Sequence, residues 1–395
     1  MKILHVIRTM DPAWGGPVEG IRNLALQASA DGHALQVTCL DEPHSPWLRN
    51  SRVRINAIGP AKCGRFGYSR NLDHWLACHI REFDVVISNG IWMYFSSAVR
   101  RASRRANVPY FLFTHGALDP WFKRYRVKHI KKQIYWSLVE HKVLRDAAAV
   151  LFTTSEELLV SNNAFRPYVC NAQVVGYGIE DPLNAGSPGR LQIREVLPQL
   201  GARPFLLFLA RVQEKKGIDL LLQSIARNIH NYKNQAFVIA GPGNDSYVSR
   251  LKMMSADLGV TDQVIWAGPL YGELKWAAIR NADAYVLPSH QENFGISVVE
   301  ALACGTPVLI TNKVNIWREI VADGGGLVEN DDLEGVNRLL QLWTGMSLEE
   351  RAAMRERARQ CFLNHFNIRA VGKNFFNLLA QSRPEIRRPL SECVS

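Results

Sequence analysis

Short runs of consecutive apolar residues alternate with longer amphipathic runs throughout the first 180 residues. Strands that are buried on both faces of a sheet are continuously apolar, so the short runs predict strands. These strands are expected at Lys2–Ile7, Leu35–Leu40, Arg54–Ile58, Asp84–Ser88, Tyr110–Thr114, Ala149–Thr153 and Gln173–Val175. The amphipathic runs predict helices at Pro17–Ala30, Asn71–Arg81, Phe95–Ala106, Val127–Arg145 and Ser155–Asn162. Regular alternation of the two predicts a parallel sheet covered by helices on both faces.

A polar stretch rich in Pro, Gly and Ser, residues 181–190, interrupts this alternation and predicts a linker. The pattern then resumes, with strands expected at Phe205–Leu209, Ala236–Ala240, Val264–Ala267, Ala284–Leu287, Val308–Thr311 and Gly326–Val328. Helices are expected at residues 348–365 and 368–381. We therefore predict an α/β protein with two Rossmann-like domains, residues 1–180 and 191–367, and a C-terminal segment at 368–395. In such sheets ligands bind at the carboxyl ends of the strands, so the cleft between the domains is the expected site.

The net charge of +11 is concentrated in one segment, because residues 100–145 hold 12 basic and 2 acidic residues. A concentrated positive surface favours anionic partners, such as an anionic membrane surface, a pyrophosphate-linked lipid or nucleic acid. Within the segment, Val127, Ile130, Ile134 and Leu138 share one face of the predicted helix, with lysines beside them. That pattern suits a membrane surface, although a solvated helix face is the commoner explanation of a charge run.

The features that the sequence lacks indicate its compartment and exclude several classes of enzyme. Seven scattered cysteines without a CxxC pair argue for a reducing compartment and against a structural zinc or disulfide framework. No apolar stretch approaches the roughly 18 residues needed to span a membrane. We therefore expect a cytoplasmic protein that begins with a strand and not with a signal peptide. Asp-x-Asp, HExxH, GxSxG and GxGxxG motifs are absent. The sequence therefore does not support a metal-dependent enzyme, a zinc hydrolase, a serine hydrolase or an enzyme with a nicotinamide cofactor.

The most informative segment is Glu292-Asn293-Phe294-Gly295, which follows a predicted strand and precedes a helix that contains Glu300. A strand that leads through a glycine loop into a helix directs backbone N–H groups at an anion. Carboxylates accept hydrogen bonds from hydroxyl groups. Anion and hydroxyl recognition side by side predict a ligand that is both, such as a sugar nucleotide.

Three further motifs lie where predicted strands end. Arg211 and Lys216, the latter followed by Gly217, place two cations at a helix start, where they would hold a diphosphate or form a solvated loop pair. Gly15-Gly16 precedes a helix and would approach a phosphate or form only a tight turn. His115 would exchange a hydrogen bond with a sugar hydroxyl near neutral pH or be a structural histidine. Asp119 would bind acceptor hydroxyls or cap the next helix.

These motifs, in this order and spacing, resemble the retaining glycosyltransferases of family 4, which have the GT-B fold. The likeness rests on Arg211-x4-Lys216-Gly217, on Glu292-x7-Glu300 and on the two-domain layout, and it covers nearly the whole chain. The Gly15-Gly16, Thr114-His115-Gly116 and Tyr177-Gly178-Ile179-Glu180 segments fit the same pattern. One departure is visible, because the family often has Asn-Gly where this chain has Tyr177-Gly178.

The resemblance implies a role for each of these positions. Arg211 and Lys216 would hold the donor diphosphate, Glu292 the donor sugar and Glu300 the ribose. The backbone of Asn293, Phe294 and Gly295 would approach sugar and phosphate, with Gly15 and Gly16 near the phosphates and His115 beside the sugar. The last helix would cross back to the N-terminal domain.

The implied reaction is transfer of a hexose from a nucleotide sugar, with retention and with neither metal nor other cofactor. The acceptor would be a polysaccharide, a lipopolysaccharide or a lipid-linked glycan at the inner face of a bacterial membrane. Other readings are a nucleotide-sugar epimerase or a phosphorylase on the same layout, or a non-catalytic protein that binds sugar nucleotides or nucleic acid. We expect no nucleic-acid partner.

Overall fold

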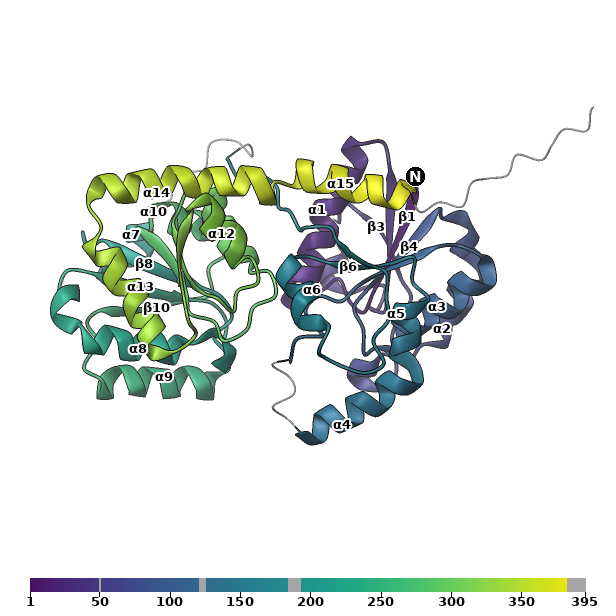
Figure 1. The fold of residues 1–395 in the computed structure, drawn as a ribbon, viewed down its shortest axis with the longest axis horizontal. Helices are drawn as coiled ribbons and strands as arrows, with labels where there is room; N and C mark the ends of the chain where they lie inside the picture. The colour runs from purple at the N-terminus through teal and green to yellow at the C-terminus, as the bar shows by residue number, and fades with distance from the viewer. Residues whose placement is uncertain (50, 121–125, 184–192, 382–395) are drawn as a thin grey trace, which may run out of the picture.

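Two α/β domains lie side by side and are joined along one edge by the C-terminal helices (Figure 1). The computed structural model describes residues 1–49, 51–120, 126–183 and 193–381. Residues 184–190 of the predicted linker, residues 382–395 of the predicted C-terminal segment and residues 121–125 of the basic segment therefore lie outside the described residues. The prediction of two Rossmann-like domains in a GT-B arrangement is confirmed.

The N-terminal domain is built on a seven-stranded sheet in the order β3-β2-β1-β4-β5-β6-β7, with every neighbouring pair parallel. Its strands are β1 (Lys2–Ile7), β2 (Ala34–Cys39), β3 (Arg54–Ala57), β4 (Val85–Asn89), β5 (Tyr110–Phe113), β6 (Ala149–Phe152) and β7 (Ala172–Val174). Its helices are α1 (Gly16–Ala30), α2 (Arg70–His79), α3 (Tyr94–Ala106), α4 (Arg126–Tyr135), α5 (His141–Arg145) and α6 (Ser155–Ser161). Strands β4, β5 and β6 are buried along their whole length, as their continuous apolar character predicts.

The C-terminal domain repeats the design with six parallel strands in the order β10-β9-β8-β11-β12-β13. The strands are β8 (Phe205–Leu209), β9 (Ala236–Ala240), β10 (Val264–Gly268), β11 (Ala284–Leu287), β12 (Val308–Thr311) and β13 (Gly326–Glu329). The helices are α7 (Ile193–Val196), α8 (Ile218–Arg227), α9 (Asp245–Asp257), α10 (Gly272–Asn281), α11 (Ile296–Ala303), α12 (Trp317–Asp323), α13 (Leu333–Gly345) and α14 (Leu348–Cys361).

The last described helix, α15 (Ile368–Gln381), leaves the C-terminal domain and packs on the N-terminal one (Figure 1). Its buried Phe375, Phe376 and Leu379 join one apolar cluster with Ile3 of β1 and Leu24 of α1. The predicted return of this helix is therefore confirmed. Where the chain crosses back, Ile179 and the segment around Asn367 form a bridge, so both connections between the domains lie against each other.

The long helix predicted at Val127–Arg145 is interrupted by a π-helical turn, Trp136–Glu140, between α4 and α5. Both end residues of that turn are buried. Trp136 Nε1 donates to Pro167 O at 2.7 Å, and Glu140 Oε1 accepts from the backbone N–H of Trp92 at 2.8 Å. These tertiary hydrogen bonds explain the local change of pitch, which hydrophobic periodicity does not reveal. Among the described helices, none is both long and apolar enough to cross a bilayer.

Candidate active site

A pocket of about 530 Å³ lies between the two domains, where strands of both sheets end. Its walls come from the loop after β1, the loop after β5, the loop after β8 and the start of α11. Most of the predicted site residues line it: Gly15, Gly16, His115, Arg211, Lys216, Glu292, Asn293, Phe294 and Gly295. We call this cavity the interdomain pocket.

An ion pair between Lys216 Nζ and Glu292 Oε2 forms the floor of the C-terminal side. Lys216 is buried because Gly217 turns the chain sharply, with a φ of 68°. A Cβ at Gly217 would lie 2.0 Å from the carbonyl oxygen of Pro288, so only glycine fits. Burial opposes ionisation of Glu292, yet the ammonium groups of Lys216 and Lys215 hold the pKa of this carboxyl below its ordinary value. These cations therefore favour the ionised form of Glu292.

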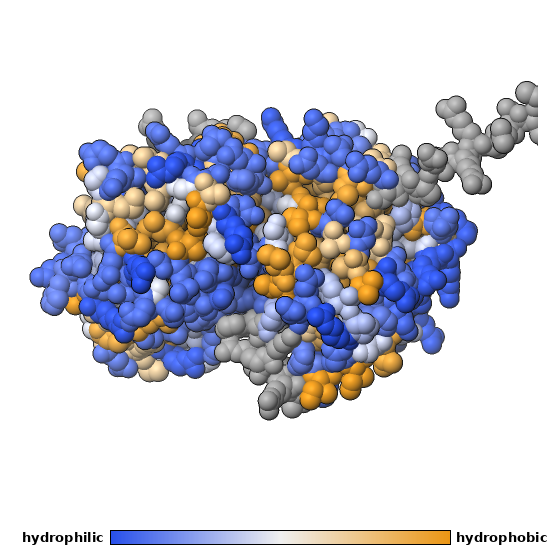
Figure 2. Space-filling model, in the orientation of Figure 1, coloured by the Kyte–Doolittle hydropathy of each residue, from blue (hydrophilic) through white to orange (hydrophobic). Residues whose placement is uncertain are grey.

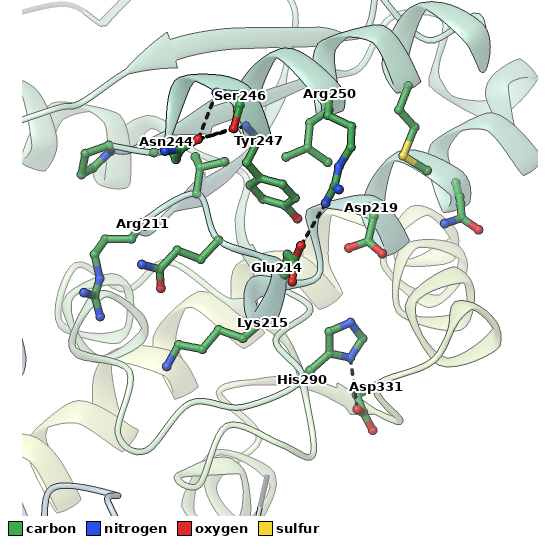
Figure 3. Close-up of a pocket in the computed structure, with 17 residues that line it drawn as sticks. Arg211, Glu214, Lys215, Asp219, Asn244, Ser246, Tyr247, Arg250, His290 and Asp331 are labelled. Carbon is green, nitrogen blue, oxygen red and sulfur yellow. Dashed lines mark hydrogen bonds and ion pairs between the residues drawn. The ribbon is translucent and has the colours of Figure 1, made fainter. Parts of the chain in front are cut away.

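Two more cations, Arg211 and Lys215, lie near this ion pair. Arg211 is exposed, and Lys215 Nζ donates to Gln291 Oε1 at 2.9 Å. Figure 3 shows both side chains extending in the same direction, away from Asp219. Burial, together with the neighbouring Lys216, lowers the pKa of Lys215 to about 8. Lys215 was not among the predicted site residues, although its place beside Lys216 and before a glycine turn is a usable signal.

The N-terminal wall is made of backbone and of one histidine. His115 has a positive φ of 48° and stacks on Phe113, with ring centroids 5.1 Å apart. Among the described residues, its Nε2 atom is buried without a hydrogen-bond partner. Burial lowers the pKa of His115 to about 4, so the imidazole is neutral at pH 7. A neutral imidazole can donate a hydrogen bond through one ring nitrogen and accept one through the other, so the predicted hydrogen bond with a sugar hydroxyl remains a prediction.

Glu157 holds the unusual backbone of the His115 loop. This residue was not among the predicted site residues. Glu157 Oε1 accepts from Thr114 Oγ1 and from the N–H of Gly116, both at 2.7 Å. Its Oε2 accepts from the N–H and the hydroxyl of Thr153, at 2.8 and 2.7 Å. The sequence showed Glu157 only as an acidic residue in the first turn of a helix, a common surface feature.

Tyr177, which stands where the family often has asparagine, contacts the Gly15-Gly16 loop. Tyr177 donates a hydrogen bond to the carbonyl of Gly16, and its ring meets Phe294 of the other domain edge-on, with centroids 5.0 Å apart. A Cβ at Gly20 would lie 1.5 Å from the Tyr177 hydroxyl. Tyr177 therefore holds the loop after β1 against Phe294 of the C-terminal domain. The missing side chain of Gly20 leaves room for the Tyr177 hydroxyl.

Two family models match the chain. "Glycosyl transferase 4-like domain" matches residues 15–159, and "Glycosyl transferases group 1" matches residues 190–361. Together they cover both sides of the interdomain pocket. The chain belongs to the group 1 glycosyltransferases.

Curated relatives of this group 1 glycosyltransferase include the D-inositol 3-phosphate glycosyltransferase of Geodermatophilus obscurus. That protein is 33% identical over 205 residues, which are 49% of this chain and 44% of the relative. An uncharacterized glycosyltransferase of Methanocaldococcus jannaschii is 27% identical over 208 residues, 51% of this chain and 50% of the relative. The chain thus spans about half the length of the curated relatives it matches.

Solved structures agree on the fold. The Anabaena protein Alr3699/HepE, in a crystal structure with UDP and glucose, superposes with a TM-score of 0.77 at 17% identity, covering 96% of this chain and 100% of that chain. WaaG, a glycosyltransferase involved in lipopolysaccharide biosynthesis, gives a TM-score of 0.66 at 17% identity, covering 95% and 99%. At these identities the likeness establishes the GT-B fold of the group 1 glycosyltransferase and no more.

Two predicted site residues of this group 1 glycosyltransferase are not among those lining the interdomain pocket. Asp119 accepts a hydrogen bond from Gln291 Nε2 at 3.2 Å and so joins the two domains. Glu300 pairs with Lys275 at 2.6 Å. Burial raises the pKa of Glu300 in spite of this lysine. No motif pointed to Lys275, because a lysine in an amphipathic helix carries no signal of its own.

Asn293 joins the loop after β11 to the N-terminal domain, because its Nδ2 donates to Thr153 Oγ1 at 3.1 Å. Gly116 faces the same side chain, and a Cβ there would lie 2.7 Å from Asn293. Within the described ranges, no group of three or more His, Cys, Asp or Glu side chains is placed to hold a metal ion.

Proposed function

We propose that this protein is a retaining glycosyltransferase that moves a sugar from a nucleotide-sugar donor to a hydroxyl of a glycan or lipid-linked acceptor, without a bound metal. The observation that carries the proposal is the grouping of three cations around Glu292, opposite an unpartnered histidine nitrogen, in one interdomain pocket. Cations placed beside a diphosphate stabilise the negative charge that develops as the diphosphate leaves. In other sites a metal ion has this role.

Each side of the pocket supplies a different part of the reaction. Arg211, Lys215 and Lys216 hold the diphosphate, while Glu292 accepts hydrogen bonds from the donor sugar. His115 Nε2 then bonds a sugar hydroxyl without carrying charge. In the proposed front-face step the bond from the sugar C1 to the diphosphate oxygen breaks, and a bond from C1 to the acceptor oxygen forms on the same face. The acceptor proton goes to an oxygen of the leaving diphosphate.

UDP-glucose is the first donor to test, since the Anabaena protein with the same fold was solved in complex with it. A thermal-shift screen over nucleotide sugars identifies the donor, because a ligand that binds only the folded state raises the apparent stability. Product anomers followed by NMR decide between retention and inversion, and activity in EDTA tests metal independence. Full activity of both Lys216→Ala and Glu292→Gln would overturn the assignment.

The acceptor side of the proposal includes a membrane surface. The described part of the α4 region exposes Ile130, Ile134 and Leu138 to 60%, 56% and 64%, in a segment of high positive charge. Figure 2 shows hydrophobic surface at the lower edge of the N-terminal domain, where α4 lies in Figure 1. An apolar stripe flanked by lysines favours peripheral attachment to an anionic leaflet, the inner face of a bacterial membrane.

Vesicle flotation tests the attachment. Wild-type protein should float with vesicles that contain anionic lipid and not with neutral ones, and binding should weaken with salt. Ile134→Asp should abolish flotation, whereas Val321→Asp, an equally exposed apolar position on α12, should not. Protein that stays unbound in low salt with anionic vesicles would contradict this part.

A further inference from the structure

A second, larger cavity adjoins the interdomain pocket on the C-terminal domain. Its volume is about 1300 Å³, compared with about 530 Å³ for the interdomain pocket. Arg211 and Lys215 line both cavities. The larger one, which we call the C-terminal groove, therefore begins at the position proposed for the donor diphosphate and leads away from it.

The C-terminal groove lies on the open side of the molecule. One of its walls is helix α9, and its floor is formed by the loop after β8 and the start of α8 (Figure 3). Figure 1 shows α8 and α9 on the side of the C-terminal domain away from α14, which together with α15 runs along the opposite edge of the two domains. Helix α4, part of the proposed acceptor side, projects from the N-terminal domain on that same open side.

The charges in the groove balance. Three cationic residues, Arg211, Lys215 and Arg250, face three acidic ones, Glu214, Asp219 and Asp331. Away from the diphosphate end, Arg250 forms an ion pair with Glu214 at 3.0 Å, and His290 Nδ1 lies 3.2 Å from Asp331 Oδ2. A groove whose charges balance offers no net attraction to a phosphate-rich ligand or nucleic acid.

The remaining lining suits a ligand rich in hydroxyl groups. The half-buried ring of Tyr247 forms part of the wall, with the Arg250 guanidinium 4.9 Å from its centroid. Burial, with the nearby Asp219 and Glu214, raises the pKa of Tyr247 to about 12, so its hydroxyl remains a donor. Amide groups of Gln213 and Gln223 add donors and acceptors. An aromatic face among planar polar groups matches a sugar ring, which presents C–H bonds on its faces and hydroxyls at its edge.

We propose that the C-terminal groove binds uncharged sugar units of an oligosaccharide acceptor, next to the unit that receives the transferred sugar. The inference rests on the proposed function and deepens it, because it selects an extended glycan over a single small sugar as the acceptor. Cavities of roughly 300–1,000 Å³ hold drug-sized ligands, so about 1300 Å³ accommodates several sugar units. The acceptor's specificity is then set partly by the domain that binds the donor.

The test is length-dependent binding. Neutral gluco-, manno- and galacto-oligosaccharides of one to five units are titrated by calorimetry against the full chain saturated with UDP. At least one series should bind tenfold or more tightly at three units than at one. Tyr247→Ala and, independently, Gln223→Ala should each remove most of that gain and leave UDP affinity within twofold. Met253→Ala, an exposed position on α9 outside the groove lining, is the matched control and should keep the gain.

The outcomes separate this inference from the proposed function. Failure of the wild-type chain to bind or turn over any nucleotide sugar would overturn the transferase itself. Normal UDP binding without length dependence in any series, or a gain that survives both Tyr247→Ala and Gln223→Ala, would overturn the groove proposal alone. Melting curves of the variants confirm that each one is folded before it is compared.

Discussion

The two walls of the interdomain pocket use different materials. The C-terminal wall carries side-chain charge, with Lys216 paired to Glu292 and with Arg211 and Lys215 beside them. The N-terminal wall offers backbone turns at Gly15 and Gly116 and a neutral His115, kept in place by the buried Glu157. Donor affinity should therefore reside almost wholly in one domain, while the other shapes the reacting position. The contrast is testable, because damage to each wall should have a different kinetic signature.

The largest effect is expected from Lys216→Ala. The substitution removes a cation from the diphosphate and takes away the ion-pair partner of Glu292, and breaking a buried pair typically costs about 3–5 kcal/mol. We expect kcat/KM to fall by about a thousandfold or more and the protein to be less stable in urea. The double variant Lys216→Met/Glu292→Gln should recover most of the stability but none of the activity. Recovery of activity in the double variant would show that the pair only stabilises the fold.

Glu157→Gln tests the N-terminal wall. An amide replaces a carboxylate that accepts four hydrogen bonds, so at least one partner is left unsatisfied at a cost of about 1–3 kcal/mol. We expect kcat to fall by about ten- to a hundredfold, with UDP affinity within threefold of wild type by calorimetry. Glu156→Gln, the neighbouring residue that pairs with Arg318 across the domains, is the control and should keep most of kcat. A large loss of UDP affinity in Glu157→Gln would break the division between the walls.

Lys215 predicts an alkaline limit to donor binding. Its pKa of about 8 means that the free protein loses this charge as the pH rises through 8, whereas a bound diphosphate favours the protonated form. UDP affinity should therefore be constant below pH 7 and fall by up to about tenfold per pH unit above pH 8. Lys215→Arg should bind equally well from pH 7 to 9.5. An alkaline loss that persists in Lys215→Arg would assign the titration to another group.

The smallest effect is expected from Tyr177→Phe, which keeps the ring against Phe294 and removes the hydrogen bond to Gly16. Loss of one such bond costs about 0.5–1.5 kcal/mol. A modest rise in the donor KM, about two- to fivefold, should accompany an unchanged kcat. Tyr177→Ala should be far more severe, since it also opens a cavity beside Gly20.

Each described strand of both sheets was predicted from the sequence. The central strands are continuously apolar because they are buried on both faces, whereas the edge strands β3 and β7 are only partly buried and carry polar residues. The sequence also predicted Arg211, Lys216 and Glu292, which the structure brings to one pocket, but it did not predict Lys215. The features that were not predicted depend on contacts between segments that are distant in the sequence. Glu157 acts on a loop 41 residues earlier, and Asp119 meets Gln291 172 residues away. The lowered pKa of His115 arises from burial, which a motif does not encode.

The return of α15 also bears on how the chain folds during synthesis. The face of β1 and α1 that receives Phe375, Phe376 and Leu379 is made first, yet its cover is made only after the whole C-terminal domain. A ribosome-bound N-terminal domain therefore carries an exposed apolar strip while some 190 residues are added, and such strips attract chaperones or aggregate. Residues 1–180 expressed alone should be poorly soluble, and adding a peptide of residues 366–381 in trans should improve their recovery.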